Sequence, residues 1–197
     1  IDAVLKVWEG LGYYARARRM HEAARKLVRE NGARFPVSYG DLLEVPGIGP
    51  YTAAAVASIA FGEAVPVVDG NVLRVMSRFL GISDDIRKQR VQARIAGVLK
   101  PVIRDVVPGE FNQALMELGA LLCVRRGPLC GQCPLAEGCC ARREGRTGAL
   151  PFKSPAKAVP TFEVAVAVCR SEGCLLIAKR KPDRMLGGLW ELPGGKR

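Results

Sequence analysis

The residues with the most specific spacing for chemistry are four cysteines in the second half of the chain. They stand at Cys123, Cys130, Cys133 and Cys139, with intervals of six, two and five residues. Thiolates this close along the chain can converge on one centre, whereas a disulfide framework is typical of short secreted proteins. The cysteines therefore predict a metal or cluster site. Their spacing alone leaves a [4Fe-4S] cluster and a tetrahedral zinc ion equally open, because both accept four thiolates.

A second candidate for chemistry is the carboxylate of Asp69, in the segment Val68-Asp69-Gly70-Asn71-Val72. It stands directly before a predicted helix. A helix cap or turn would therefore explain Asp69 and Asn71 without any further role. The interpretation of Asp69 depends on what precedes it.

About twenty residues upstream, the segment 45–52 joins two predicted helices through Pro46-Gly47-Ile48-Gly49-Pro50. Pro46 stops one helix and Pro50 can open the next. Gly47 and Gly49 permit positive φ and close backbone approach, so amide N–H groups at the following helix can face a phosphate. This pattern is a helix-hairpin-helix signature and predicts binding to a DNA backbone. Its alternative is an ordinary tight turn between packed helices.

The charge of the chain also points to a polyanionic partner. Thirty Lys and Arg against nineteen Asp and Glu give a formal net charge of +11, which concentrates nucleic acid near the protein. Seven of the basic residues lie between Arg16 and Arg34. A solvated helix face explains part of this excess, but the neighbouring Tyr13-Tyr14 pair suits contacts with bases and phosphates.

The elements that must position these residues are mainly α-helical up to about residue 141. Gly and Pro separate the helical segments, and period-two alternation is weak. The predicted helices cover residues 1–9, 15–30, 39–44, 50–61, 72–80, 88–99 and 110–122. A Pro-containing connector follows at 142–160. Strands at 162–168 and 174–178, joined by a turn at 171–173, indicate the start of a second, α+β domain.

Several phrases, taken together, resemble one family. They are Trp8-Glu9-Gly10-Leu11-Gly12-Tyr13-Tyr14, the hairpin at 45–52, Val68-Asp69-Gly70-Asn71-Val72, residues 111–120 and the cysteine spacing. The chain resembles the helix-hairpin-helix DNA glycosylases, and within them the branch that removes adenine. The resemblance implies a helical glycosylase domain at 1–141, a [4Fe-4S] cluster held in loop 123–139, a linker at 142–160 and the start of a second domain at 161–197.

The resemblance implies a base-excision repair enzyme that hydrolyses the N-glycosidic bond of adenine mispaired with 8-oxoguanine or guanine, after flipping the nucleotide out of the duplex. Asp69 would stabilise the oxocarbenium-like sugar, with Tyr51 and Asn71 beside it. In the family, a glutamate upstream of the Trp8 phrase protonates the base. These residues do not include it, so we expect this chain alone to be inactive. A related glycosylase/lyase branch, the endonuclease III type, uses a lysine where Tyr51 stands and forms an imine with the sugar. Tyrosine has no amine and cannot form this imine, so the resemblance implies a glycosylase without efficient lyase activity.

The resemblance also implies contacts with double-stranded DNA containing A:8-oxoguanine or A:G mismatches. Tyr13 would wedge into the duplex. The expected DNA-binding residues are Tyr13, Arg16, Arg18, Gly47, Gly49, Thr52 and Gln113. The phrase at 187–196 resembles the approach to a Nudix box, and implies a Nudix-like domain that recognises 8-oxoguanine. We expect a monomer in the bacterial cytoplasm, associated with the nucleoid and not with a membrane. The alternatives are an endonuclease III-like glycosylase/lyase and a non-enzymatic iron-sulfur DNA-binding module.

Overall fold

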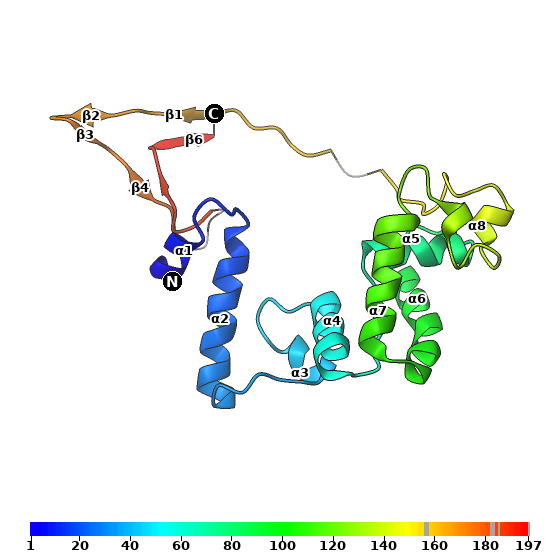
Figure 1. Cartoon of the computed structure of the whole chain (residues 1–197). Coiled ribbons are helices and arrows are strands. Elements are labelled where there is room, and N and C mark those ends of the chain that lie inside the picture. Colours follow the sequence, from blue (N-terminus) through cyan, green and yellow to red (C-terminus); the bar gives the residue numbers. More distant parts are fainter. Residues whose placement is uncertain (156–157, 182–183, 185, 197) are drawn as a thin grey trace. The chain divides into compact units, whose positions relative to one another are not determined.

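The computed structural model describes residues 1–155, 158–181, 184 and 186–196 (Figure 1). The chain forms two compact units. One unit combines Ile1–Lys26 with Ala156–Arg197, and the other comprises Leu27–Pro155. Among the described residues, no helix has both the length and the apolar character needed to cross a membrane.

The Leu27–Pro155 unit is helical, as the sequence predicts. Its α-helices are α3 (Tyr39–Leu43), α4 (Pro50–Phe61), α5 (Gly70–Phe79), α6 (Gln89–Val102), α7 (Pro108–Glu117) and α8 (Cys140–Arg143). Shorter helical turns are η1 (Ile103–Asp105), η2 (Leu118–Leu122) and η3 (Cys130–Gln132), of which η2 is π-helical. Regular structure therefore continues into the cysteine-containing loop.

Helix α5 is the centre of the larger hydrophobic core. Its residues Val72, Val75 and Met76 are buried with Ile95 and Leu99 of α6. A smaller cluster of Leu42, Ala53 and Ala57 packs α3 against α4. Ala53, Ala54 and Ala57 are buried, so three of the alanines in α4 pack the helix. These two cores hold the helical hairpin and α5 in place.

The helix ends follow the local signals in the sequence. Ser38 caps α3 by accepting a hydrogen bond from the Asp41 N–H at 3.1 Å. Helix α4 begins with Pro50 and ends before Gly62, which has a left-handed φ of 70°. Proline suits a first turn and glycine suits the position after a helix. The predicted limits of α4, 50–61, are therefore confirmed.

The helix predicted at 110–122 is interrupted. Helix α7 ends at Glu117 and continues as the π-helical turn η2. Gly119 allows the chain to come close to the start of α5 here. A Cβ at Gly119 would lie 2.6 Å from the Cβ of Asn71, so only glycine lets η2 pass the start of α5 at this distance. The π-helical turn thus lies in close contact with the segment after Asp69. Such turns are frequent at functional sites.

In its described residues, the other unit contains α1 (Asp2–Val7), the beginning of α2 (Tyr14–Asn31) and six short strands. The strands form three antiparallel pairs. These pairs are β1 (Val164–Val166) with β6 (Gly194–Lys196), β2 (Arg170–Ser171) with β3 (Cys174–Leu175), and β4 (Ala178–Lys179) with β5 (Trp190–Glu191). The β2–β3 hairpin turns through Glu172 and Gly173, which both have positive φ. The predicted turn at 171–173 is confirmed.

The first part of the expected connector packs on the helical unit. The Ile86 N–H donates to the Phe152 carbonyl at 3.2 Å, and the backbone N–H and hydroxyl of Ser154 both donate to the Asp85 carboxylate. Leu150 is buried as well. Proline-rich sequence looks like a linker because it forms no regular element, but such a segment can still pack. The limits predicted at 141 and 161 remain a prediction.

Candidate active site

Asp69 occupies the N-cap of α5, and both of its carboxylate oxygens are engaged. Oδ1 accepts a hydrogen bond from the Val72 N–H at 2.7 Å, and Oδ2 accepts one from the Asn71 side-chain amide at 3.0 Å. The half-buried carboxylate is therefore held in one orientation at the positive end of a helix. The capping interpretation is correct, and it leaves a fixed, solvent-accessible anion at this position.

Arg74 connects this anion to the cysteine loop. Its Nη2 donates to Asn71 Oδ1 at 2.8 Å and to the Gly119 carbonyl at 2.6 Å, while its Nε donates to the Cys123 carbonyl at 2.7 Å. A continuous chain of hydrogen bonds therefore runs from Asp69 through Asn71 and Arg74 to Cys123. Hydrogen bonds from a charged donor are the stronger kind, so this path fixes the orientation of Asn71.

The four predicted cysteines line one small cavity of about 30 Å³. Its remaining walls include Arg78, Leu122, Pro128, Ala136, Arg142 and Thr147. Within the described part of the chain, no group of three or more His, Cys, Asp or Glu side chains is placed closely enough to hold a metal ion. The structure thus gathers the four sulfur-bearing side chains about a shared space, and supplies cationic side chains at its wall.

A buried arginine, Arg78, stands beside this cavity, and the sequence analysis did not predict it. Its side chain is 2% exposed. The guanidinium donates to the carbonyls of Leu150, Val124 and Arg125 at 2.9, 2.7 and 3.1 Å, and to the carbonyl and sulfur of Cys123 at 3.2 and 3.3 Å. The sequence carried no signal for this burial, because Asn71, Arg74 and Ser77 on the same helix are typical of an amphipathic helix with a polar face.

The predicted hairpin has the expected geometry at its first glycine. Gly47 has a φ of 85°, whereas Gly49 is extended and forms the N-cap of α4. The Ile48 N–H donates to the Val45 carbonyl at 3.0 Å and closes the turn. Tyr51 and Thr52 follow in the first turn of α4, where backbone N–H groups have no intrahelical acceptor, and both side chains are exposed. The hairpin therefore presents N–H donors at an exposed surface.

The other predicted DNA-binding residues differ in their surroundings. Tyr13 is 82% exposed, and the Arg16 guanidinium lies 5.7 Å from the centre of its ring. Arg18 instead donates to the Gly187 carbonyl. Gln113 is exposed and donates to the Gly109 carbonyl of its own helix at 3.1 Å. Tyr13 is thus freely accessible, whereas Arg18 has an internal partner.

A basic cavity next to Asp69 adds cations that sequence reasoning missed. This cavity of about 400 Å³ is lined by Gly70 and by Arg74, Arg125, Arg126 and Lys153, among others. Arg125 and Arg126 lie in the six-residue interval between the first two cysteines, so the sequence already placed them in the predicted cluster loop. Lys153 could not be found in this way, because only the packing of the 150–154 segment brings it here.

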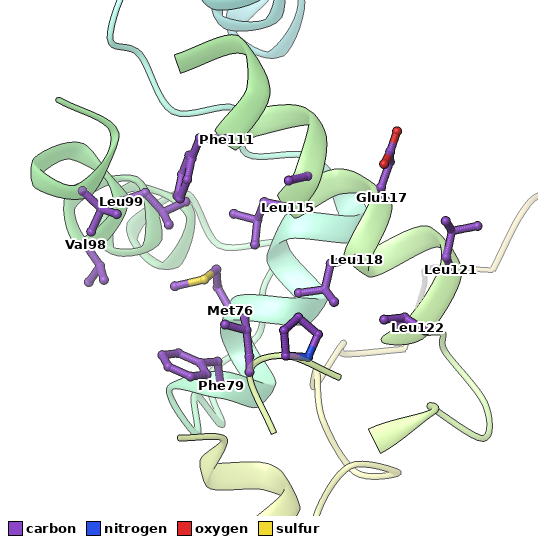
Figure 2. Close-up of a pocket in the computed structure, with 14 residues that line it drawn as sticks. Met76, Phe79, Val98, Leu99, Phe111, Leu115, Glu117, Leu118, Leu121 and Leu122 are labelled. Atoms are coloured by element: carbon purple, nitrogen blue, oxygen red, sulfur yellow. The ribbon is translucent and has the colours of Figure 1, made fainter. Parts of the chain in front are cut away.

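An apolar cavity of about 560 Å³ lies elsewhere in the same unit (Figure 2). Met76 and Phe79 of α5 point toward it with Leu99 of α6, Leu115 of α7 and Leu122 of η2. Pro134 and Leu135, next to a predicted ligand cysteine, complete the wall. None of the site residues predicted from the sequence lines this cavity. It is where the cysteine loop meets the helical core.

Residues 2–101 match the family described as HhH-GPD superfamily base excision DNA repair protein. The adenine DNA glycosylase of Homo sapiens is 36% identical over 98% of the chain and 44% of its own length, and that of Arabidopsis thaliana is 44% identical over 96% and 32%. A thermostable thymine-DNA glycosylase superposes with a TM-score of 0.65 at 28% identity, over 73% of this chain and 66% of that one.

The fold and the matched residues define a helix-hairpin-helix base-excision repair protein. The chain belongs to the HhH-GPD superfamily, and the mainly helical fold predicted from the sequence is confirmed. It spans less than half the length of the human and Arabidopsis relatives it matches. The family match runs through residues of both compact units, from α1 to α6.

Proposed function

We propose that this chain carries the adenine-excising site of a DNA glycosylase, which hydrolyses the N-glycosidic bond of adenine paired with 8-oxoguanine or guanine. The observation that carries the proposal is the fixed carboxylate of Asp69, held by Val72 and Asn71 beside a basic cavity. The relatives named adenine DNA glycosylase, which match nearly the whole chain, favour adenine as the excised base.

Asp69 would act on the charge that develops at the sugar. As the bond between C1′ and the base breaks, the electron pair leaves with the base and the sugar becomes cationic. A carboxylate about 4 Å from that cation contributes roughly 4 kcal/mol at an effective dielectric near 20, or close to a thousandfold in rate. Water then adds to C1′ and releases a proton, which balances the proton that the departing adenine takes up. The nucleotide must first leave the base stack, at a cost of a few kcal/mol.

Asn71 and Arg74 would keep Asp69 ready for this task. Asn71 binds Asp69 Oδ2, and Arg74 holds the opposite end of the Asn71 side chain. A carboxylate that needs no reorientation loses none of its electrostatic effect to rearrangement. We therefore assign Asn71 as a positioning residue and Arg74 as its support.

Tyr51 favours a glycosylase without strand-cutting lyase activity. It stands exposed in the first turn of α4, directly after the hairpin. Its phenol cannot form an imine with the sugar, and the sequence has no lysine between Lys26 and Lys88. We propose that Tyr51 contacts the sugar next to Asp69.

Duplex DNA is the proposed partner, and three features support it. The hairpin presents backbone N–H groups at Gly49, Tyr51 and Thr52, which suit a phosphate. The basic cavity with Arg125, Arg126 and Lys153 lies at the start of α5, beside Asp69. Exposed Tyr13 has the flat ring that a wedge between base pairs requires. Arg16, Arg18 and Gln113 are proposed as further DNA contacts.

A [4Fe-4S] cluster is the proposed occupant of the cysteine-lined cavity. Cys123, Cys130, Cys133 and Cys139 would be its ligands, since four thiolates are the donor set of such clusters. The positive Arg78 at the cavity wall also suits a thiolate-bound, negatively charged group. When bound, the cluster would brace the loop that carries Arg125 and Arg126, because ligand binding adds to folding free energy. Four thiolates also suit zinc, and metal analysis separates the two.

Residues 161–197 are proposed to begin a Nudix-like domain that recognises 8-oxoguanine. The three antiparallel strand pairs agree with an α+β start. The proposed organisation is a glycosylase domain at 1–141 with the cluster loop at 123–139, a connector at 142–160 and the second domain from 161.

The proposal is tested by single-turnover adenine release from a duplex with adenine opposite 8-oxoguanine. The full-length protein is compared with its Asp69→Asn variant, since asparagine caps a helix almost as well but carries no charge. We expect a loss of about a thousandfold, with strand breaks mainly after alkali treatment. Asp84→Asn is the matched control, because Asp84 pairs with Arg90 on the surface.

Two results would contradict this proposal. Direct strand cutting without alkali, at oxidised pyrimidines in place of adenine, would move the protein to the endonuclease III-like class. DNA binding with no base release, unchanged by Asp69→Asn, would indicate a non-enzymatic binding module.

A further inference from the structure

The buried guanidinium of Arg78 has an unusual set of partners. Four of its five hydrogen-bond acceptors are backbone carbonyls and the fifth is the sulfur of Cys123. Within the described residues, no carboxylate lies within ion-pair distance of this side chain. Arg78 is one of the least exposed side chains of the helical unit.

Burying a cation without a counter-charge is costly. Removing a guanidinium from water costs several kcal/mol even after local relaxation, and carbonyl dipoles alone offset this only in part. Arginine cannot escape the cost by losing its proton, because its guanidinium stays protonated in proteins. A negative group is therefore expected next to Arg78, and the only candidate that its contacts identify is the cysteine-lined cavity.

The contacts of Arg78 reach two of the four cysteines. Its Nη1 lies 3.3 Å from Cys123 Sγ, and its own backbone carbonyl lies 3.5 Å from Cys139 Sγ. These are the first and last cysteines of the set, and they belong to segments that approach α5 from opposite ends of the loop. Arg78 also forms part of the cavity wall.

We propose that Arg78 is the buried counter-charge of the cluster and sets its reduction potential through the hydrogen bond to the Cys123 thiolate. The inference rests on the cluster proposed above. Hydrogen bonds to ligand sulfurs and the net charge around a cluster are two of the factors that determine its potential. A positive donor withdraws electron density from the thiolate and favours the more reduced state, so removing it shifts the midpoint to more negative values.

Arg78 is a positioning residue in this proposal and touches no substrate. It also holds the loop, since its remaining bonds fix Val124, Arg125 and Leu150. A merely structural arginine would stabilise these segments without changing the potential. The two roles are separated by measuring the potential as well as the stability.

The test uses the full-length protein, purified without oxygen, with the variants Arg78→Lys and Arg78→Met. Arg142→Met is the matched control, because Arg142 lines the same cavity but is solvent-exposed. Iron and acid-labile sulfide are measured per chain, the midpoint potential is measured by voltammetry, and cluster loss is followed in the presence of a chelator.

We expect Arg78→Met to shift the one-electron equilibrium toward the oxidised form by at least tenfold, which corresponds to a 59 mV lower midpoint. Arg78→Lys keeps a charge but loses the planar fork, so it should shift less. Arg142→Met should stay near the parent value, because solvent screens its charge. Chelators should remove the cluster at least tenfold faster from Arg78→Met.

The inference is overturned if both Arg78 variants keep the parent potential, or if Arg142→Met shifts it as far as Arg78→Met. If Arg78→Met does not hold a cluster, Arg78→Lys alone decides by its potential. A parent protein that binds zinc, or neither iron nor sulfide, refutes the cluster proposal itself. That failure is seen in the metal analysis before any variant is compared.

Discussion

Replacing Asn112 by leucine removes the side chain that ties three segments together just before Asp69. Asn112 lies on α7 and is fully buried. Its Oδ1 accepts from the Val67 N–H at 2.9 Å, and its Nδ2 donates to the Val65 carbonyl at 3.0 Å and to the Ser58 hydroxyl oxygen at 2.8 Å. Leucine has nearly the same shape and neither polar group. The variant therefore isolates the hydrogen bonds.

The expected loss follows from the partners that remain unpaired. The Val67 N–H is buried and loses its acceptor, which costs about 1–3 kcal/mol. The Val65 carbonyl is half-buried and loses a donor at a smaller cost. Ser58 keeps its bond to the Ala54 carbonyl at 2.7 Å. In sum, we expect the free energy of unfolding of the helical unit to fall by about 3 kcal/mol.

Urea unfolding followed by far-UV circular dichroism measures this loss. Tryptophan fluorescence would not report on the helical unit, because Trp8 and Trp190 both belong to the other unit. A second readout is amide hydrogen exchange at Val67, which should become roughly a hundredfold faster for a 3 kcal/mol change. Gln113→Leu is the matched control. Gln113 is the next residue, is exposed and donates to the Gly109 carbonyl of its own helix, so its variant should stay within about 0.5 kcal/mol.

An Asn112→Leu variant within about 1 kcal/mol of the parent protein would refute this reasoning. It would mean that water or a backbone shift satisfies the Val67 N–H. Unchanged exchange at Val67 together with lower global stability would place the loss elsewhere in the core.

Two further predictions concern the contact between Gly119 and Asn71 and the hydrogen bonds of Asp85. Gly119→Ala should lower the free energy of unfolding by about 1–3 kcal/mol and slow adenine release, because the added Cβ would press on Asn71. Gly97→Ala is the control in the same urea and release assays. Gly97 has open space around it, so this variant should be neutral or stabilising. Arg87 and then Ser154 lower the pKa of Asp85, so the stability that this carboxylate contributes is present above its unfolded pKa of about 3.9 and is lost as pH falls below it. Asp85→Asn should therefore flatten the dependence of the urea midpoint on pH below about 4, and an unchanged slope would contradict this assignment.

Helix positions were predictable because their signals are local. Pro50, Gly62 and Ser38 act through the backbone of their own turn, and each stands where α4 or α3 begins or ends. Asp69 is a more instructive case. As a residue before a helix it predicts a cap, and the structure confirms that cap at 2.7 Å to the Val72 N–H. A cap uses only one carboxylate oxygen, whereas the second oxygen of Asp69 accepts a hydrogen bond from Asn71, which capping does not require.

The supporting residues could not be predicted, because their environment is made by segments far along the chain. Arg74 and Arg78 look like two more cations in a basic protein. They differ from the other cations because the segment at 123–125 and Leu150 return to α5 in the fold. These acceptors lie between 45 and 72 residues after the arginines in the sequence. Local patterns carry no information about such a return.

The two arginines together make α5 the mechanical link between the cysteines and Asp69. Asp69 caps the start of the helix, Arg74 follows about one turn later and Arg78 about two turns later, and both arginines donate to the same Cys123 carbonyl. A displacement of Cys123 must therefore break charged hydrogen bonds at α5 or move Arg74, and with it Asn71 and the carboxylate. Loss of whatever the cysteines hold should thus impair Asp69 through this path, even where the helices themselves remain folded.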